Sequence, residues 1–218
     1  MSKKTIFSTI EIPKTLDGPD YLIDDILQIG KVISSFFELF GASMRMVKND
    51  VDGNLRKLSS SKDLIASGDS AVSICQMLTH EKKRGINKKD PSGTIGLLWL
   101  KRTFDFTVAL LAFLTTHINR NNQATMALYL KQAYDKTLKF HHNVFMKTTF
   151  NTVITVAAPY RSDFIQKIAL DNTLSEQEIL DDVKSCLSQL APILSNVHKI
   201  LVSFQEEKDL ESNIYMIS

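Results

Sequence analysis

The sequence predicts an all-α protein, and two observations carry that prediction. No proline lies between Pro19 and Pro91, or between Pro91 and Pro159, so helices can run through these stretches without interruption. Apolar residues recur three or four positions apart through most of both stretches, which is the spacing of one helix face. Strand-like alternation is strong only in the short N-terminal segment TIFSTIEI, so one brief strand is the most that we expect.

A single domain is expected over residues 1–218. Hydrophobic residues make up 44% of the 218 positions, which is enough for a real core. The sequence contains no internal repeat and no stretch of linker-like composition. Residues 1–19 are expected to form an irregular N-terminal extension of this domain.

Three helices are expected before the basic loop EKKRGINKKD. The first begins near Asp20 and ends near Gly41, since glycine often follows a helix. Its apolar face comprises Leu22, Ile26, Ile29, Ile33 and Phe37. The second runs roughly from Met46 to Leu58. The third leads into the basic loop, and its apolar positions are Leu64, Val72, Cys75 and Leu78.

Two helices are expected after the basic loop. Ser92 or Thr94 can cap the first, a strongly apolar helix that continues to about Thr116. The second begins near Gln123, and its apolar positions include Leu128, Leu130 and Tyr134.

The C-terminal part predicts three more helices. One passes through His142 and leads to Pro159, which suits the first turn of the next. Ser175 and Glu178 then form a capping box at the start of the last helix, in which we expect a kink at Pro192. The apolar face of this last helix comprises Ile179, Val183, Cys186, Leu190, Leu194, Val197 and Leu201.

Charge and cysteine content argue against several classes of protein. The net charge is +2, which is too small to indicate nucleic-acid binding. Two cysteines among apolar residues do not make a disulfide framework, so a reducing, cytoplasmic setting fits. The N-terminus lacks the apolar run of a signal peptide. Three charged residues interrupt the most hydrophobic segment, residues 95–114, which argues for a buried helix and against a bilayer span.

Motifs for catalysis or metal binding are scarce. The five histidines include no pair at the four-residue spacing of a helical zinc site. The sequence also lacks a G-x-S-x-G motif, a phosphate-binding glycine loop and a cysteine cluster. We therefore expect a protein that is not an enzyme and holds neither metal nor cofactor.

One polar constellation stands out. Asp50, Asn54 and Lys57 are spaced to share one face of a helix, and Trp99, the only tryptophan, lies in a separate apolar helix. A carboxylate, an amide and an ammonium group can bind sugar hydroxyls, and a flat indole can cover the apolar face of a sugar ring. The alternative is an ordinary solvated helix face beside a packed tryptophan. Gly53 adds a little to the first interpretation, because glycine within a helix permits close approach by another group.

Three blocks of this sequence resemble the glycolipid transfer protein family, and the resemblance covers about residues 20 to 215. KNDVDGNLRKL matches the family pattern D-x-x-x-N-x-x-K. GLLWLKRTFDF matches the segment in which the family places its tryptophan before a leucine and a basic pair. AYDKTLKFHHNVFMKTTF, followed by AAPYRSDF, matches the family histidine and the A-P-Y-[KR]-x-D-F signature.

The resemblance implies a two-layer helical sandwich of about eight helices and non-enzymatic transfer of glycolipids between membranes. By position, Asp50, Asn54, Lys57 and Trp99 correspond to the contacts of the sugar headgroup. His142, in preference to its neighbour, corresponds to the histidine that hydrogen-bonds the ceramide amide. Tyr215 resembles a tyrosine near the family's C-terminus and is a further candidate for a residue of the glycolipid site. The expected hydrocarbon pocket is lined by Ile95, Leu98, Phe106, Leu110, Phe150 and Val153.

The sequence departs from the family in places that bear on membrane docking. Val144 stands where the mammalian pattern has a tryptophan that helps docking, and Phe145 beside it can serve instead. SFFELFG resembles a short motif by which some members reach an endoplasmic-reticulum receptor, but Phe36 and Phe37 are better interpreted as core residues.

Headgroup chemistry separates the alternatives. Relatives that carry phosphorylated ceramide place cations where this chain has Asn54 and Trp99, and again one turn later, where it has Thr103. Because phosphate favours clustered cations, this sequence favours a neutral sugar. We expect a monomer that touches membranes transiently, since no lipid anchor motif is present. A glycolipid sensor or interaction protein, and a carrier of a phosphorylated sphingolipid, are the alternatives.

Overall fold

The computed structural model describes residues 4–16, 18–66, 70–116 and 124–208, and this part of the chain is all-helical. Its α-helices are α1 (Ile23–Glu38), α2 (Arg45–Ile65), α3 (Ile74–Lys83), α4 (Gly93–Thr116), α5 (Ala127–Lys136), α6 (Val144–Ala157), α7 (Arg161–Ile168) and α8 (Glu176–Ser203). Three short 3₁₀ helices accompany them: η1 (Phe7–Thr9), η2 (Gly41–Met44) and η3 (Leu138–Phe140). The prediction of an all-α fold of about eight helices is confirmed.

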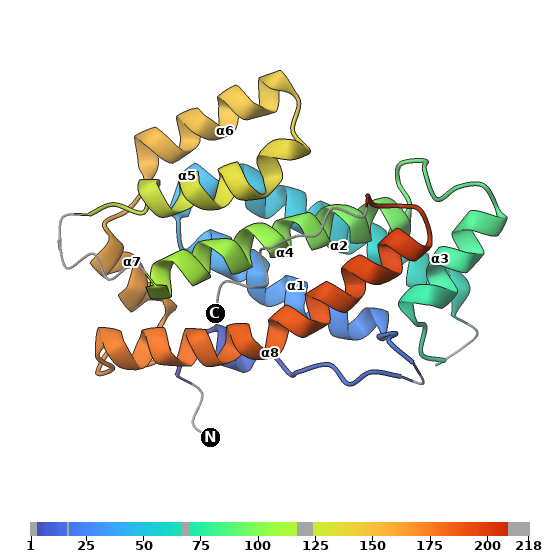
Figure 1. The fold of residues 1–218 in the computed structure, drawn as a ribbon, viewed down its shortest axis with the longest axis horizontal. Coiled ribbons are helices and arrows are strands. Elements are labelled where there is room, and N and C mark those ends of the chain that lie inside the picture. The colour runs from blue at the N-terminus through green and yellow to red at the C-terminus, as the bar shows by residue number, and fades with distance from the viewer. Residues whose placement is uncertain (1–3, 17, 67–69, 117–123, 209–218) are drawn as a thin grey trace.

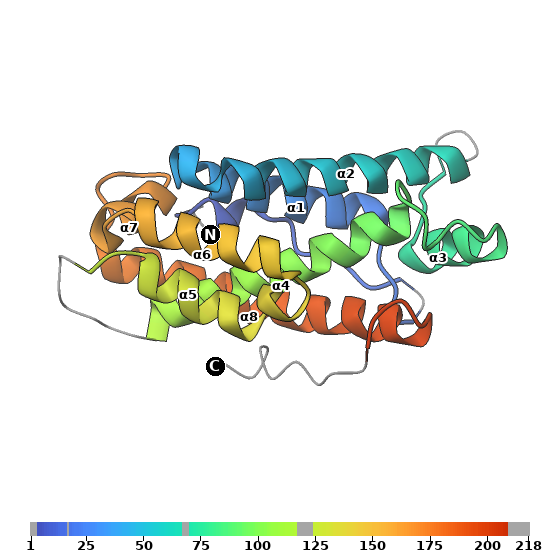
Figure 2. The same ribbon diagram turned by 90° about the horizontal axis from the view of Figure 1, so that it is seen from above.

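The helices form two layers (Figures 1 and 2). Helices α1 and α2 lie side by side along one side, and α4, α5 and α8 lie along the other. Helix α4 packs against α2, α5 and α8, which makes it the central helix of the fold. Helix α6 lies next to α5, which in turn packs against α4.

Burial explains why α4 is apolar on all sides. Nearly all of its side chains are buried, including Phe104, Phe106 and Leu110, so it needs no polar face. The expectation of a buried helix at residues 95–114 is therefore confirmed. In the part of the chain that the structure describes, no helix is both long enough and apolar enough to cross a membrane.

The double phenylalanine of SFFELFG belongs to the core. Phe36 and Phe37 are both fully buried. Phe36 makes an edge contact with Phe164 of α7 at 5.6 Å between ring centroids, and Phe37 stacks on Phe106 at 6.1 Å. These contacts confirm the core interpretation of the two residues.

Helix ends follow from local polar chemistry. The predicted capping box at Ser175 is present, and its hydroxyl accepts a hydrogen bond from the Glu178 backbone N–H at 3.3 Å. Ser92 caps α4 by accepting from the Ile95 N–H at 3.2 Å, which decides between the two cap candidates. Gly41, three residues beyond the end of α1 and at the start of η2, adopts φ +71°, a backbone conformation that favours glycine.

Three local predictions were wrong, and the expected kink in the last helix fits the structure. TIFSTIEI is not a strand; it contains η1, and its Phe7 packs against the ring of Phe36 at 5.1 Å. Helix α2 continues to Ile65, so Leu64 belongs to it and not to the third helix. His142 lies before α6, whose N-cap is Asn143. Helix α8 runs as one helix through Pro192, and Figure 1 shows that it changes direction along its length, in keeping with the kink expected there.

Candidate functional site

Helix α2 presents Asp50, Asn54 and Lys57 as one hydrogen-bonded chain. The Asn54 amide donates to Asp50 Oδ2 at 3.1 Å, and Lys57 Nζ donates to Asn54 Oδ1 at 3.4 Å. Lys57 also pairs with Asp90 at 2.7 Å. The structure thus brings the three predicted residues together. Asn54 is the buried member, with only 2% of its surface exposed, and its amide is held in one orientation by both neighbours.

Asp50 lies at the edge of this chain, where a ligand can reach it. Partial burial of the carboxyl group raises the pKa of Asp50, while the charge of Lys57 and the hydrogen bond from Asn54 act in the opposite direction. A carboxylate that is partly desolvated in this way forms strong hydrogen bonds with hydroxyl donors.

Gly96 sets the distance between α2 and α4 at this point. A Cβ atom built on Gly96 would lie 2.8 Å from the Asn54 carbonyl oxygen and 3.1 Å from Lys57 Cβ. Only glycine permits this approach, which brings Trp99, one turn further along α4, close to the polar chain. Gly96 was not among the predicted site residues, although a glycine inside an apolar helix pattern is a signal of close packing. At Gly53, by contrast, the nearest atom, in Arg56, is 3.8 Å away, so no element packs closely there.

Trp99 is half-buried and contacts two side chains. Its ring centroid is 6.2 Å from that of His142, and the Arg102 guanidinium lies over the indole at 5.0 Å. Trp99 lines the cavity and does not belong to the buried core cluster, which argues against the alternative of a packed core tryptophan.

His142 lies in an aromatic setting. Tyr134 Oη lies 3.2 Å from His142 Nδ1, and the Phe150 ring lies 5.9 Å from the imidazole. Partial burial and the charge of Lys147 lower the pKa of His142, so a neutral imidazole predominates at neutral pH. Sequence reasoning missed Tyr134 as a site residue, because its contact with His142 depends on how α5 leads into η3.

A cavity of about 360 Å³ is lined by Asp50, Trp99 and His142 together. Its lining combines Asp50 of α2 with rings of α4 and α6 and with several apolar side chains. It comprises Met46, Val47, Asp50, Trp99, Thr103, Leu138, His141, His142, Asn143, Met146 and Phe150. Both histidines line it, but His142 is the one in contact with Trp99 and Tyr134. Burial lowers the pKa of His141 to about 4, with the nearby Arg102 charge acting in the same direction.

The expected hydrocarbon residues are packed in the interior. Leu98, Phe106, Leu110 and Phe150 belong to one core cluster, and Val153 packs against it. Ile95 is half-buried on α4. Among them, Phe150 connects the core to the cavity, because it lines the cavity and makes an edge contact with Phe106 at 5.7 Å. Tyr215 lies outside the described residues.

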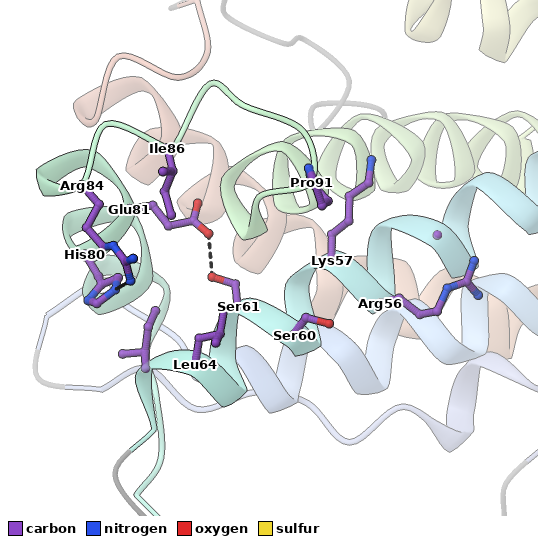
Figure 3. Close-up of a pocket in the computed structure, with 12 residues that line it drawn as sticks. Arg56, Lys57, Ser60, Ser61, Leu64, His80, Glu81, Arg84, Ile86 and Pro91 are labelled. Carbon is purple, nitrogen blue, oxygen red and sulfur yellow. Dashed lines mark hydrogen bonds between the residues drawn. The ribbon is translucent and has the colours of Figure 1, made fainter.

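A second cavity, of about 400 Å³, lies on the other side of Lys57, between α2 and α3 (Figure 3). Beside it, the buried Glu81 carboxylate holds the first turn of α4. It accepts four hydrogen bonds, from Ser61 Oγ at 2.6 Å, Gly93 N at 2.8 Å, Thr94 N at 2.9 Å and Thr94 Oγ1 at 2.6 Å. Glu81 therefore fixes the start of the helix that carries Trp99. Within the described ranges, no three His, Cys, Asp or Glu side chains are grouped as metal ligands.

Comparisons with known proteins show which family this sequence matches. The family model "Glycolipid transfer protein (GLTP)" matches residues 22–170. The chain is 30% identical over 187 residues to glycolipid transfer protein 1 of Arabidopsis thaliana, covering 86% of this chain and 87% of that protein. It is 29% identical over 184 residues to the glycolipid transfer protein of Aureobasidium melanogenum, covering 84% and 82%.

Solved structures share the fold. HET-C2, a fungal glycolipid transfer protein, is 26% identical with a TM-score of 0.68, covering 96% of each chain. The GLTP-fold structure of FAPP2 superimposes with a TM-score of 0.79 at 21% identity, covering 94% of this chain and 98% of that one. Human ceramide-1-phosphate transfer protein, in complex with 12:0 ceramide-1-phosphate, gives 0.74 at 16% identity, with coverage of 93% and 94%.

Proposed function

Because the chain belongs to the glycolipid transfer protein family, we propose that it binds a glycolipid and carries it between membranes without changing it chemically. It acts as a single domain and a monomer in this proposal. The observation that supports it best is the hydrogen-bonded chain Asp50–Asn54–Lys57, whose end residue Asp50 lines the same cavity as Trp99 and Phe150.

The proposed recognition divides the lipid into three parts. Asp50 accepts sugar hydroxyl protons, while the amide of Asn54 and the ammonium of Lys57 supply further hydrogen bonds. The indole of Trp99 stacks on the sugar ring. His142, neutral and next to the apolar wall, hydrogen-bonds the amide of the ceramide.

The hydrocarbon chains enter the interior beyond Phe150 in this proposal. The residues that would line their path are Ile95, Leu98, Phe106, Leu110, Phe150 and Val153. Each buried CH₂ group contributes about 0.8 kcal/mol, so enclosure makes the passage of two long chains through water feasible. Because these side chains are packed against one another, the helices must move apart to admit a lipid.

Charge favours a neutral headgroup over a phosphorylated one. A phosphate site needs unpaired cations, whereas Lys57 is paired with Asp90 at 2.7 Å and Arg102 with Glu207 at 2.8 Å. Asn54 supplies a neutral amide at the centre of the site. Carriage of a phosphorylated sphingolipid is therefore the weaker candidate.

Transient membrane contact is proposed at the N-terminal end of α6. Phe140, Val144 and Phe145 are exposed there to 73%, 80% and 76% of their surfaces. Exposed apolar side chains beside the entrance to a lipid site favour shallow insertion into a bilayer. Val144 stands at the family's tryptophan position, so Phe145 supplies the aromatic ring in this surface.

The test is transfer of a fluorescent galactosylceramide between vesicles by the variant Asp50→Val. We expect transfer to be abolished while the helical circular dichroism is unchanged. Asp63→Val makes the same change at an exposed position of α2 and should transfer normally. Full transfer by Asp50→Val would refute the headgroup assignment. Tight glycolipid binding without transfer by the wild-type protein would favour a sensor.

A further inference from the structure

Beyond α8 the chain turns back onto α4 and the loop before it (Figure 1). Three hydrogen bonds fix this turn, residues 204–208. They join Lys82 Nζ to the Phe204 carbonyl at 2.9 Å, Asn87 Nδ2 to Glu206 Oε1 at 2.6 Å, and Arg102 Nε to Glu207 Oε2 at 2.8 Å. A segment far along the sequence thus reaches the helix that carries the proposed headgroup site.

The contact between Arg102 and Glu207 lies against one face of the Trp99 indole. Arg102 is bound by Glu207 and at the same time covers one face of Trp99, at 5.0 Å from the ring. A sugar ring can then stack only on the other face. The two charged side chains are largely shielded from solvent, with 14% of Arg102 and 8% of Glu207 exposed, so salt in solution screens them little.

The pair does not line the cavity itself, but it lies near enough for its charges to act on a residue that does. The charges of Arg102 and Glu207 both act on His141, which lines the cavity, and they act in opposite directions. The pKa of Glu207 is lowered. Burial alone would raise it, but this effect is outweighed by hydrogen bonds from Arg102 and the Lys208 N–H and by the charges of Arg102 and His141. Glu207 is therefore ionised at neutral pH and cancels the charge of Arg102.

We propose that Glu207 sets the charge selectivity of the headgroup site by neutralising Arg102 behind Trp99. With Glu207 in place, Arg102 supports the indole but presents no net charge, so the site takes uncharged sugars. Without Glu207, the same guanidinium is a free cation next to the indole, and it admits headgroups that carry a sulfate. Glu207 is a positioning residue in this proposal, which rests on the proposed glycolipid transfer.

Glu207→Gln in the full chain tests the proposal, because it removes the charge and retains a hydrogen-bond acceptor. Transfer between zwitterionic vesicles is measured for galactosylceramide and for its sulfated form, each at the same low mole fraction. We expect the ratio of sulfated to neutral transfer to rise about tenfold, the size of one partly buried charge interaction. The matched control is Glu206→Gln, which alters the neighbouring carboxylate, bound to Asn87, and should leave the ratio unchanged.

A second variant keeps the test decisive. Arg102→Gln combined with Glu207→Gln leaves no uncompensated charge, so its ratio should return to the wild-type value even if the single variant folds poorly. An unchanged ratio in a folded Glu207→Gln protein, or a raised ratio in the double variant, would overturn the proposal. If the wild-type protein transfers no galactosylceramide at all, the proposed function fails instead.

Discussion

Gly96 on α4 touches the backbone of Asn54 on α2, where a methyl group would come within 2.8 Å of the carbonyl oxygen. We expect Gly96→Ala to push the two helices apart, lowering the free energy of unfolding by about 1–3 kcal/mol. Glycolipid affinity should fall with it, because Trp99 would move away from the polar chain. Urea unfolding and vesicle transfer measure the two effects.

Gly53→Ala is the matched control on α2. The nearest side-chain atom there, of Arg56, is 3.8 Å away, so a methyl group fits without displacement. Alanine in a helix interior should raise the free energy of unfolding by about 0.5–1 kcal/mol. If the two substitutions had the same sign, close packing at Gly96 would not be the cause.

Glu81→Gln should weaken the start of α4. The carboxylate accepts hydrogen bonds from Ser61, Gly93 and Thr94, which outweigh its burial and lower the pKa of Glu81. Replacing a buried charged acceptor with an amide is expected to cost about 2 kcal/mol in urea unfolding. Glu178→Gln makes the same change at an exposed cap, where glutamine also serves, and should cost little.

Phe145→Ser should slow transfer through loss of membrane contact while leaving binding intact. Its side chain is 76% exposed at the start of α6, so the folded protein loses little packing. Binding of a short-chain soluble glycolipid, measured by calorimetry, should match the wild type. Leu64→Ser removes an equally exposed apolar group, 79% exposed at the far end of α2, and should transfer normally. Equal loss in both variants would argue against a specific docking surface.

Stability should fall in mild acid because of His141. Burial lowers its pKa to about 4, whereas an unfolded histidine titrates near its ordinary value of 6.5. Between these values the unfolded chain binds more protons than the native one, so the contribution to stability present above pH 6.5 is lost as the pH falls toward 4. Urea unfolding at pH 7.5 and pH 5 should show a smaller decrease for His141→Gln than for the wild type. Equal decreases would contradict this account.

Periodicity and capping chemistry predicted the helices well, because both act within a few residues. The capping box of α8 and the buried α4 followed directly from Ser175, Glu178 and an uninterrupted apolar run. Where contacts between distant segments determine the local structure, the sequence alone did not predict it. TIFSTIEI alternates like a strand, yet Phe7 packs on Phe36 as part of η1, and α2 extends well beyond Leu58.

The candidate site divides in the same way. Spacing placed Asp50, Asn54 and Lys57 on one face of a helix, and the structure joins them by hydrogen bonds. Gly96, Tyr134 and the pair of Arg102 with Glu207 depend on how separate helices meet, a relationship that spacing along one helix does not contain.

Trp99, which contacts both Arg102 and His142, is the only tryptophan in the chain. The intrinsic fluorescence excited at long ultraviolet wavelengths therefore comes from one place, the wall of the cavity. A sugar stacking on the indole, or a guanidinium leaving its other face, changes the emission of the entire protein. The fold thus carries an optical probe of its own occupancy, and a binding titration needs neither a dye nor a label.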